Sequence, residues 1–291
     1  MLPQELIRKV KLIEITTRKI VNDIVSGNYK SHFKGHGVQF SEHRLYVPGD
    51  DVRHIDWKVS ARTRDPMIKK YEEERELTVF LVVDLSGSKT FASSKKLKSE
   101  VVAEIGGMLA YAASQTGDKV GVLIFTDQVE LIIPPRKGRQ HVLRVIRDLL
   151  VYSPRSKGTN LGVALDAASR IMRHSGIIFI VSDFIADDYQ LPLKRLSSRH
   201  DVVAIAIEDE RERVIPDIGP ILLQDPETGE ESLVDTSSYA FKKWFENYRK
   251  EFDSNIRSAL KGKGEFLRIN TQEDYGEAVV RFFHARSRRK K

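Results

Sequence analysis

The chain has 291 residues, of which 41% are hydrophobic and 31% charged, so it is long and apolar enough to bury a full core. It contains no cysteine, which excludes disulfides, thiolate zinc sites, iron–sulfur clusters and cysteine nucleophiles. The net charge is +7, and much of the excess lies in a basic tail at residues 286–291.

We interpret this tail as a solvated terminus without a partner. The alternatives are, in order, binding of an acidic protein and binding of RNA or DNA. The apolar runs of the chain are far shorter than the ~20 residues needed to cross a bilayer. The first residues, MLPQELIRKV, are amphipathic and have no signal-peptide core. We therefore expect a cytoplasmic protein without a membrane span.

Residues 1–28 are predicted to hold one long amphipathic helix. Apolar residues recur there at close to helical spacing, and Gly27 follows as a stop. The positions are Leu6, Val10, Ile13, Ile20 and Ile24.

Residues 29–76 are punctuated by glycine and proline, which predicts short strands and ordered loops packed on or beside the main domain. The stretch RLYVPGDDVRHIDW crowds arginines and carboxylates, which form bidentate pairs, so we interpret it as a structural ion-pair network. The alternative is a partner-docking surface with two aromatic anchors. Its residues would be Tyr46, Asp50, Asp51, Arg53 and Trp57. The spacing of His36, His43 and His54 matches no compact zinc pattern, and we expect them to be uncoordinated.

Residues 77–285 alternate between strand-like and helix-like segments, which predicts an α/β fold with a doubly wound, mainly parallel sheet. The helix at about 95–115 is expected to bury a face made by Leu97, Val101, Ile105, Leu109 and Ala112. Two strand-like runs separated by only Asp127-Gln128 predict a hairpin whose second strand is antiparallel at one edge. A surface hairpin is expected within an insertion at about 208–236.

Oxygen-bearing side chains follow three segments of this domain. The stretch VFLVVDLSGSKT places Asp84, Ser86 and Ser88 at the exit of a buried strand, and Thr159 precedes a helix in KGTNLGVAL. Asp183 leaves the strand that ends in IVSDF. Ligand sites in parallel sheets gather where strands deliver their carboxyl ends.

These five residues are predicted to bind Mg²⁺, with Mn²⁺ and Ca²⁺ as alternatives, because hard cations take oxygen ligands in near-octahedral array. Asp183 would bind directly or hold a coordinated water. Two carboxylates roughly neutralise a divalent ion, and a coordination place stays open for an acidic group of a partner. Each serine or threonine alone would be an ordinary helix N-cap, so the prediction depends on the whole set.

The pattern Asp84-x-Ser86-x-Ser88, with Gly158-Thr159-Asn160 and Ser182-Asp183, resembles the metal-ion-dependent adhesion site of von Willebrand factor type A domains. The upstream stretch GHGVQFSEHRLYVPGDDVRHIDW is similar to the bacterial family called domain of unknown function fifty-eight, which couples such a segment to such a domain. The resemblance implies a von Willebrand factor A-like fold. It also implies that the protein acts together with a MoxR-type AAA+ ATPase in the chaperone-like maturation of other proteins.

We expect a non-enzymatic protein-binding module whose partner is a MoxR-type ATPase or its client. The enzymatic alternative is a metal-dependent phosphoester hydrolase. Against it, Ser86 occupies the position where an aspartyl phosphatase has its acid/base aspartate. The chain lacks a nucleophile elbow and a Walker-type GKS or GKT sequence. Nucleic-acid binding through the basic surface is the third hypothesis, and it is disfavoured.

Overall fold

The computed structural model describes residues 37–74, 77–86, 97–225, 228–260 and 264–289, together with four residues of the N-terminal segment. The chain forms two units: the smaller unit is His32–Leu77, and the larger unit holds the rest. The four N-terminal residues are Arg8, Val10, Lys11 and Ile13; all are helical, and Ile13 is buried. The rest of the helix predicted at 1–28 lies outside the described residues.

The smaller unit is a two-stranded antiparallel sheet with a short helical connection. Strand β1 (Gly37–Leu45) pairs with β2 (Met67–Glu74), and η1 (Val52–His54) and α2 (Trp57–Thr63) lie between them. Asp56 begins α2 as its N-cap, because its carboxylate accepts from the backbone N–H of Lys58 and Val59. How this unit packs on the main domain stays a prediction.

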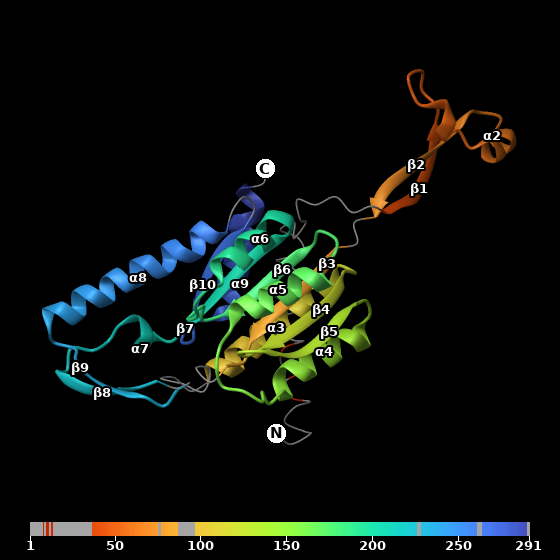
Figure 1. Ribbon diagram of the computed structural model, residues 1–291. Coiled ribbons are helices and arrows are strands. Elements are labelled where there is room, and N and C mark those ends of the chain that lie inside the picture. Colours follow the sequence, from red (N-terminus) through yellow and green to blue (C-terminus); the bar gives the residue numbers. More distant parts are fainter. Residues whose placement is uncertain are drawn as a thin grey trace. The chain divides into compact units, whose positions relative to one another are not determined.

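The larger unit is built on a six-stranded sheet with strand order β10-β7-β6-β3-β4-β5 (Figure 1). All neighbours are parallel except β4 and β5, which form the predicted hairpin and leave β5 antiparallel at the edge. The strands are β3 (Thr78–Asp84), β4 (Lys119–Phe125), β5 (Val129–Arg136), β6 (Ile177–Ser182), β7 (Asp201–Glu208) and β10 (Glu265–Asn270). The predicted mainly parallel α/β fold is confirmed.

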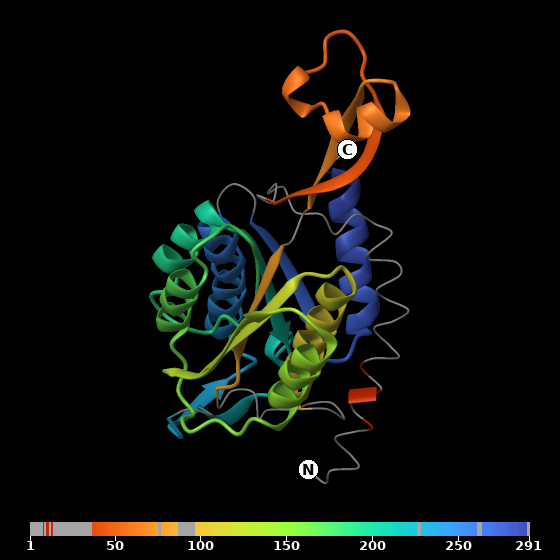
Figure 2. The same cartoon turned by 90° about the vertical axis from the view of Figure 1, so that its right-hand side faces the viewer.

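Helices cover both faces of this sheet (Figure 2). One face carries α3 (Lys98–Gln115), α4 (Arg139–Val151) and α9 (Tyr275–Arg289). The other carries α5 (Leu161–Ile171), α6 (Gln190–Arg199) and α8 (Tyr239–Ala259). Because both faces are covered, the central strands are apolar runs that are buried along their whole length, as in other parallel sheets.

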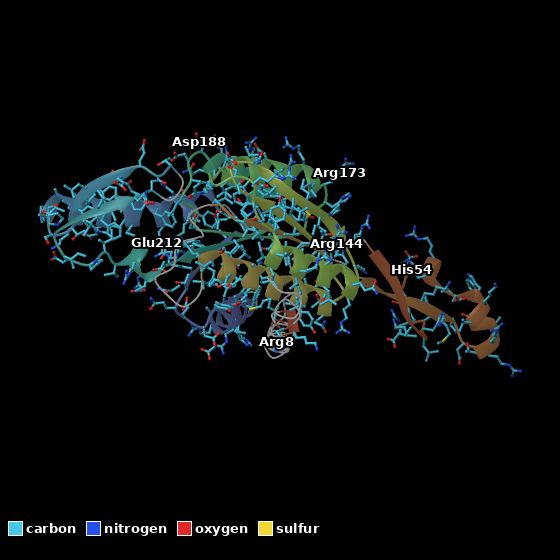
Figure 3. The ribbon with its side chains drawn as sticks, turned by 90° about the horizontal axis from the view of Figure 1, so that it is seen from below. Arg8, His54, Arg144, Arg173, Asp188 and Glu212 are labelled. Carbon is cyan, nitrogen blue, oxygen red and sulfur yellow. The ribbon has the colours of Figure 1, made fainter. Side chains whose placement is uncertain are left out.

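An insertion follows β7, at the edge of the sheet where the parallel strands end. It holds the short helix α7 (Glu210–Arg213) and an antiparallel hairpin of β8 (Pro220–Gln224) and β9 (Glu231–Asp235), and it leads into α8. Figure 3 labels Glu212 of α7 toward this end of the larger unit and Arg173 toward the other. The insertion thus brings its charged residues to the carboxyl edge of the sheet.

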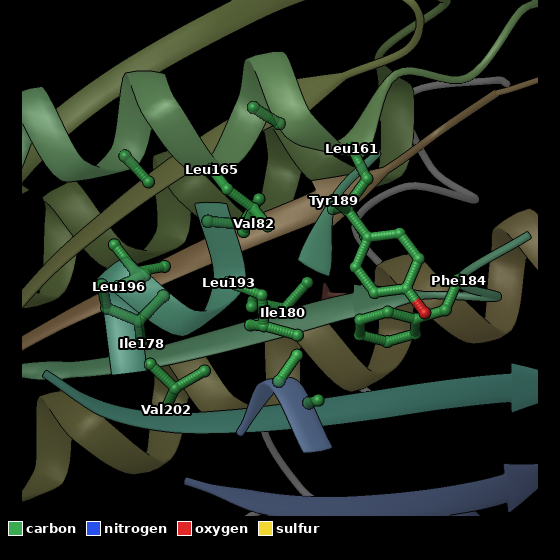
Figure 4. Packing of buried hydrophobic residues seen from close by; sticks show 14 of the residues in the cluster. Val82, Leu161, Leu165, Ile178, Ile180, Phe184, Tyr189, Leu193, Leu196 and Val202 are labelled. Carbon is green, nitrogen blue, oxygen red and sulfur yellow. The ribbon is translucent and has the colours of Figure 1, made fainter. Parts of the chain in front are cut away.

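The core under α5, α6 and α8 fixes the positions of the strand ends. Val82 and Ile180 of the central strands pack there against Leu161, Leu165 and the loop residues Phe184 and Tyr189 (Figure 4). The Phe184 and Tyr189 rings meet edge to face with centroids 5.8 Å apart. The loop that follows Asp183 is therefore anchored by aromatic packing close to the predicted site.

The C-terminal helix corrects the expectation of a solvated basic tail at Arg286, the first residue of the predicted tail. Helix α9 continues to Arg289, and Arg286 lies within it, 7% exposed and paired with the buried carboxylate of Asp201. Arg286 is therefore a structural residue of α9. Among the described residues, no helix combines the length and apolar character that crossing a membrane requires.

Candidate metal centre

Asp84 is the last residue of β3 and is fully buried. One carboxylate oxygen, Oδ1, accepts the backbone N–H of Ser86 at 3.0 Å. The other, Oδ2, accepts the hydroxyl of Ser182 at 2.5 Å. The strand pairing of Val83 with Val181 places Asp84 beside Ser182, so the sheet register itself creates this contact.

Asp183 directly follows β6 and is 2% exposed. Its Oδ1 accepts the N–H of Ile185 at 3.2 Å, and its Oδ2 lies 3.3 Å from the ammonium nitrogen of Lys98. The hydroxyl of the preceding Ser182 accepts the N–H of Phe184 at 3.0 Å, which fixes the turn after the strand. Asp84 and Asp183 therefore leave neighbouring parallel strands, tied together through Ser182.

Thr159 lies in the loop before α5 and is partly buried. Its neighbour Asn160 donates its backbone N–H to the carbonyl of Thr126 at 2.9 Å, and the Asn160 side chain caps α5 by accepting from Val163 N–H. Thr126 follows β4, which pairs with β3 on the side away from β6. Thr159 is thus held at the end of the strand next to Asp84.

The structure brings four of the five predicted ligands to one edge of the sheet. Asp84 and Ser86 are in direct hydrogen-bond contact, Asp183 joins them through Ser182, and Thr159 follows the anchored tip of β4. Ser88 lies outside the described residues. Coordination of a metal by this set stays a prediction.

The four predicted ligands that the structure describes fit a hard divalent cation by their chemistry. All four present oxygen, and two of them are carboxylates that are almost completely withdrawn from water. Burying ionised carboxylates costs free energy unless positive charge or hydrogen bonds compensate. In the described part of the chain, no group of three or more histidine or acidic side chains is arranged to hold a metal. A cation here would therefore depend on hydroxyl ligands as well as carboxylates.

Lys98 and Glu212 are two further charged residues at this edge, and neither was among the predicted site residues. The Lys98 side chain is fully buried, and its ammonium lies 2.8 Å from both carboxylate oxygens of Glu212. The sequence contains one indication that Lys98 is buried: it stands three residues before Val101 and seven before Ile105, which places it on the apolar face of α3. Leu97 was expected on that face, but it is the N-cap residue and is 42% exposed.

A small cavity of about 40 Å³ adjoins Asp183 and connects this edge to α8. Its lining consists of Asp183, Ile185, Glu208, Glu212, Tyr248, Arg249 and Phe252. Burial, followed by the negative charge of Asp183, raises the pKa of Tyr248, and burial raises the pKa of Tyr189 to about 12. Both phenols therefore stay protonated at neutral pH and can donate hydrogen bonds.

The residues proposed for partner docking lie in the smaller unit. Asp50 forms a bidentate pair with Arg44, at 2.7 and 2.6 Å, and this hydrogen bonding lowers the pKa of Asp50 to about 2. Asp51 pairs with Arg53 at 2.8 Å.

The two aromatic residues of that set differ in exposure. Tyr46 is partly buried, whereas Trp57 is 71% exposed. The acids therefore serve contacts inside the unit, and Trp57 is the residue of the set that offers an open apolar surface. Partner binding by this set stays a prediction.

The fold and the strand-end oxygens define a doubly wound α/β protein with a candidate cation site at the carboxyl edge of its sheet. Residues 42–254 match the family described as "Protein of unknown function DUF58", and the chain belongs to that family.

Two relatives illustrate the similarity in sequence. The chain is 31% identical over 285 residues to the uncharacterized protein Rv1480 of Mycobacterium tuberculosis, an alignment that spans 96% of this chain and 89% of the relative. It is 30% identical over 129 residues to the uncharacterized protein YeaD of Bacillus subtilis, covering 44% of this chain and 30% of that protein.

Two solved structures align with this chain at low sequence identity. The conserved hypothetical protein BatB from Bacteroides thetaiotaomicron aligns with a TM-score of 0.49 at 14% identity, over 73% of this chain and 99% of that one. A von Willebrand factor type A protein from Catenulispora acidiphila aligns with a TM-score of 0.42 at 15% identity, over 73% of this chain and 42% of that one.

Proposed function

We propose that this protein is a non-enzymatic module that binds Mg²⁺ at the carboxyl edge of its sheet and uses the metal to capture an acidic residue of a partner protein. The observation that carries the proposal is the pair of buried carboxylates, Asp84 and Asp183, on adjacent strand ends joined through Ser182. Mn²⁺ and Ca²⁺ are alternative ions for the same oxygens.

The chemistry of capture follows from the number of ligands. Mg²⁺ takes six oxygen ligands and readily keeps water in some of those places. The five protein side chains, Asp84, Ser86, Ser88, Thr159 and Asp183, would leave room for one outside ligand. A carboxylate is a better ligand for a hard cation than a neutral carbonyl, so the open place favours an aspartate or glutamate of a partner.

The partner class comes from the family resemblance. We propose a MoxR-type AAA+ ATPase or its client, with this protein acting as an adaptor in maturation or assembly. The exposed Trp57 of the smaller unit supports a second contact with such a partner, because exposed aromatic residues are frequent anchors of protein interfaces.

One observation favours the alternative of a phosphoester hydrolase. The buried ammonium of Lys98, 3.3 Å from Asp183, is a charge that could stabilise a phosphoryl group next to Asp84. Two features weigh against it. Glu212 already neutralises Lys98, and Ser86 cannot act as a general acid or base near neutral pH.

The test is calorimetric titration of the purified protein with Mn²⁺ and Mg²⁺, with the Asp84→Asn variant beside it. We expect wild type to bind one ion and Asp84→Asn to lose at least about 100-fold in affinity, because a charged ligand is removed. Asp65→Asn makes the same chemical change at an exposed position of the smaller unit and should bind as wild type does.

Partner capture is tested with the MoxR-type ATPase of the same organism. Retention on immobilised protein should require the divalent ion, end on addition of chelator, and be absent with Asp84→Asn. Absence of metal binding by folded wild type would refute the proposal. If wild type hydrolysed a phosphate ester and Asp84→Asn did not, the result would support the phosphoester hydrolase instead of the protein-binding module.

A further inference from the structure

Lys98 is a lysine with no contact with water. It stands in the first turn of α3, its side-chain exposure is 0%, and its ammonium contacts Asp183 at 3.3 Å and Glu212 at 2.8 Å. Lysine is almost never fully buried unless its charge is paired. One carboxylate partner, Asp183, directly follows β6, and the other, Glu212, lies in the short helix α7 after β7, so the position of Lys98 depends on the tertiary fold.

Glu212 is held in position by its own short helix. Its carboxylate accepts the N–H of Asp209 at 3.0 Å, and the Asp209 side chain in turn accepts from Arg211 N–H and from the Thr271 hydroxyl. This reciprocal capping fixes α7 against the loops that follow β7 and β10. The Glu212 side chain, 28% exposed, is therefore presented to Lys98 by an ordered turn.

The Lys98 ammonium contacts two carboxylates at unequal distances. These carboxylates are Asp183, at 3.3 Å, and Glu212, at 2.8 Å. Asp183 therefore shares the Lys98 ammonium with Glu212, and the ammonium lies closer to Glu212.

We infer that Lys98 and Glu212 set the affinity of this edge for a divalent cation. The Lys98 ammonium competes with the metal for Asp183, and Glu212 weakens that competition by drawing the ammonium toward itself. The inference rests on the proposed function, because it concerns the same metal. It makes Lys98 and Glu212 positioning residues that act through Asp183.

Substitutions of the two residues should change the Mn²⁺ affinity in opposite directions. Replacing Lys98 by methionine removes a positive charge from beside the metal position and should tighten Mn²⁺ binding by about tenfold or more, since like charges a few Å apart repel strongly away from water. Replacing Glu212 by glutamine leaves the ammonium to Asp183 and should weaken binding by roughly threefold to tenfold, because Glu212 is partly solvated.

The experiment compares Mn²⁺ affinities of wild type, Lys98→Met, Glu212→Gln and the double variant by calorimetry and by electron paramagnetic resonance of free Mn²⁺. Lys194→Met and Glu246→Gln are matched changes at exposed positions and should leave the affinity unchanged. The double variant should bind more tightly than Glu212→Gln. This comparison reveals the sign of the Lys98 effect even if Lys98→Met alone fails to fold.

A purely structural role predicts a different result, in which both single variants weaken binding and the double variant is weaker still. That result, or equal affinities in all four proteins, would overturn the inference while leaving the metal site intact. If folded wild type bound no Mn²⁺ at millimolar concentration, the proposed function would fail together with the inference.

Discussion

Glu130 shows how one carboxylate organises a loop that leads to the candidate metal centre. It accepts hydrogen bonds from the hydroxyls of Thr126 and Tyr152, at 2.9 and 3.0 Å, and from the backbone N–H groups of Arg155 and Ser156. Burial opposes its ionisation, but these donors outweigh burial and lower the pKa of Glu130. The loop that carries Thr159 therefore starts from a segment fixed by a single ionised side chain.

Glu130→Gln should destabilise the larger unit by roughly 1–3 kcal/mol at pH 7, because a neutral amide accepts these bonds less strongly and has only one acceptor oxygen. A lowered folded-state pKa contributes stability that is present above the unfolded value of about 4.3 and lost as the pH falls through the folded value. The difference in the free energy of unfolding between wild type and Glu130→Gln, measured with urea, should therefore become smaller as the pH falls below about 4. A gap that widened there would contradict this assignment.

At the residue scale, the sequence indicated the carboxylates of the candidate metal centre more readily than their counter-charges. Asp84 and Asp183 could be predicted because Asp84 ends one buried apolar strand and Asp183 directly follows another, and the strand pattern is local. Lys98 could not be assigned a role, because its partner Asp183 lies 85 residues away and the pairing depends on how α3 packs on the sheet. Glu212 was hidden for the same reason, in an insertion without a periodic pattern.

At the scale of elements, α9 is attached to the sheet by a buried ion pair as well as by apolar contacts. Arg286 reaches Asp201 at the start of β7, and Phe283 meets Phe179 of β6 edge to face with centroids 6.0 Å apart. The run of basic residues suggested a solvated tail, since composition alone cannot tell which arginine of a run faces the core. The pairing again joins residues 85 positions apart.

Arg286→Met should destabilise the protein by about 3–5 kcal/mol, because it removes the guanidinium from beside a carboxylate that has no contact with water. Arg288→Met changes an exposed residue of the same helix and should stay within about 0.5 kcal/mol of wild type. Urea unfolding followed by circular dichroism measures both. Equal stabilities of the two variants would show that the buried pair contributes nothing to holding α9.

At the scale of the whole molecule, the division into two units determines where a bound ion can act. The candidate metal centre lies entirely within the larger unit, on the ends of β3, β4 and β6. The smaller unit has its own sheet and its own ion pairs, Arg44 with Asp50 and His43 with Asp56. A ligand stabilises the structure that binds it, so a unit that opens independently gains nothing from an ion bound elsewhere.

Mg²⁺ at about 100 times its dissociation constant should therefore add about 2.7 kcal/mol to the stability of the larger unit alone. For a unit of this size, that gain corresponds to a rise in melting temperature of about 5–10 °C. Hydrogen exchange should slow in peptides from β3, β6 and α3, while peptides from β1, α2 and β2 exchange at an unchanged rate. Asp84→Asn should show neither effect. Protection that spread equally into β1 and β2 would show that the two units open together, because the ion could then stabilise the smaller unit only through a cooperative contact between them.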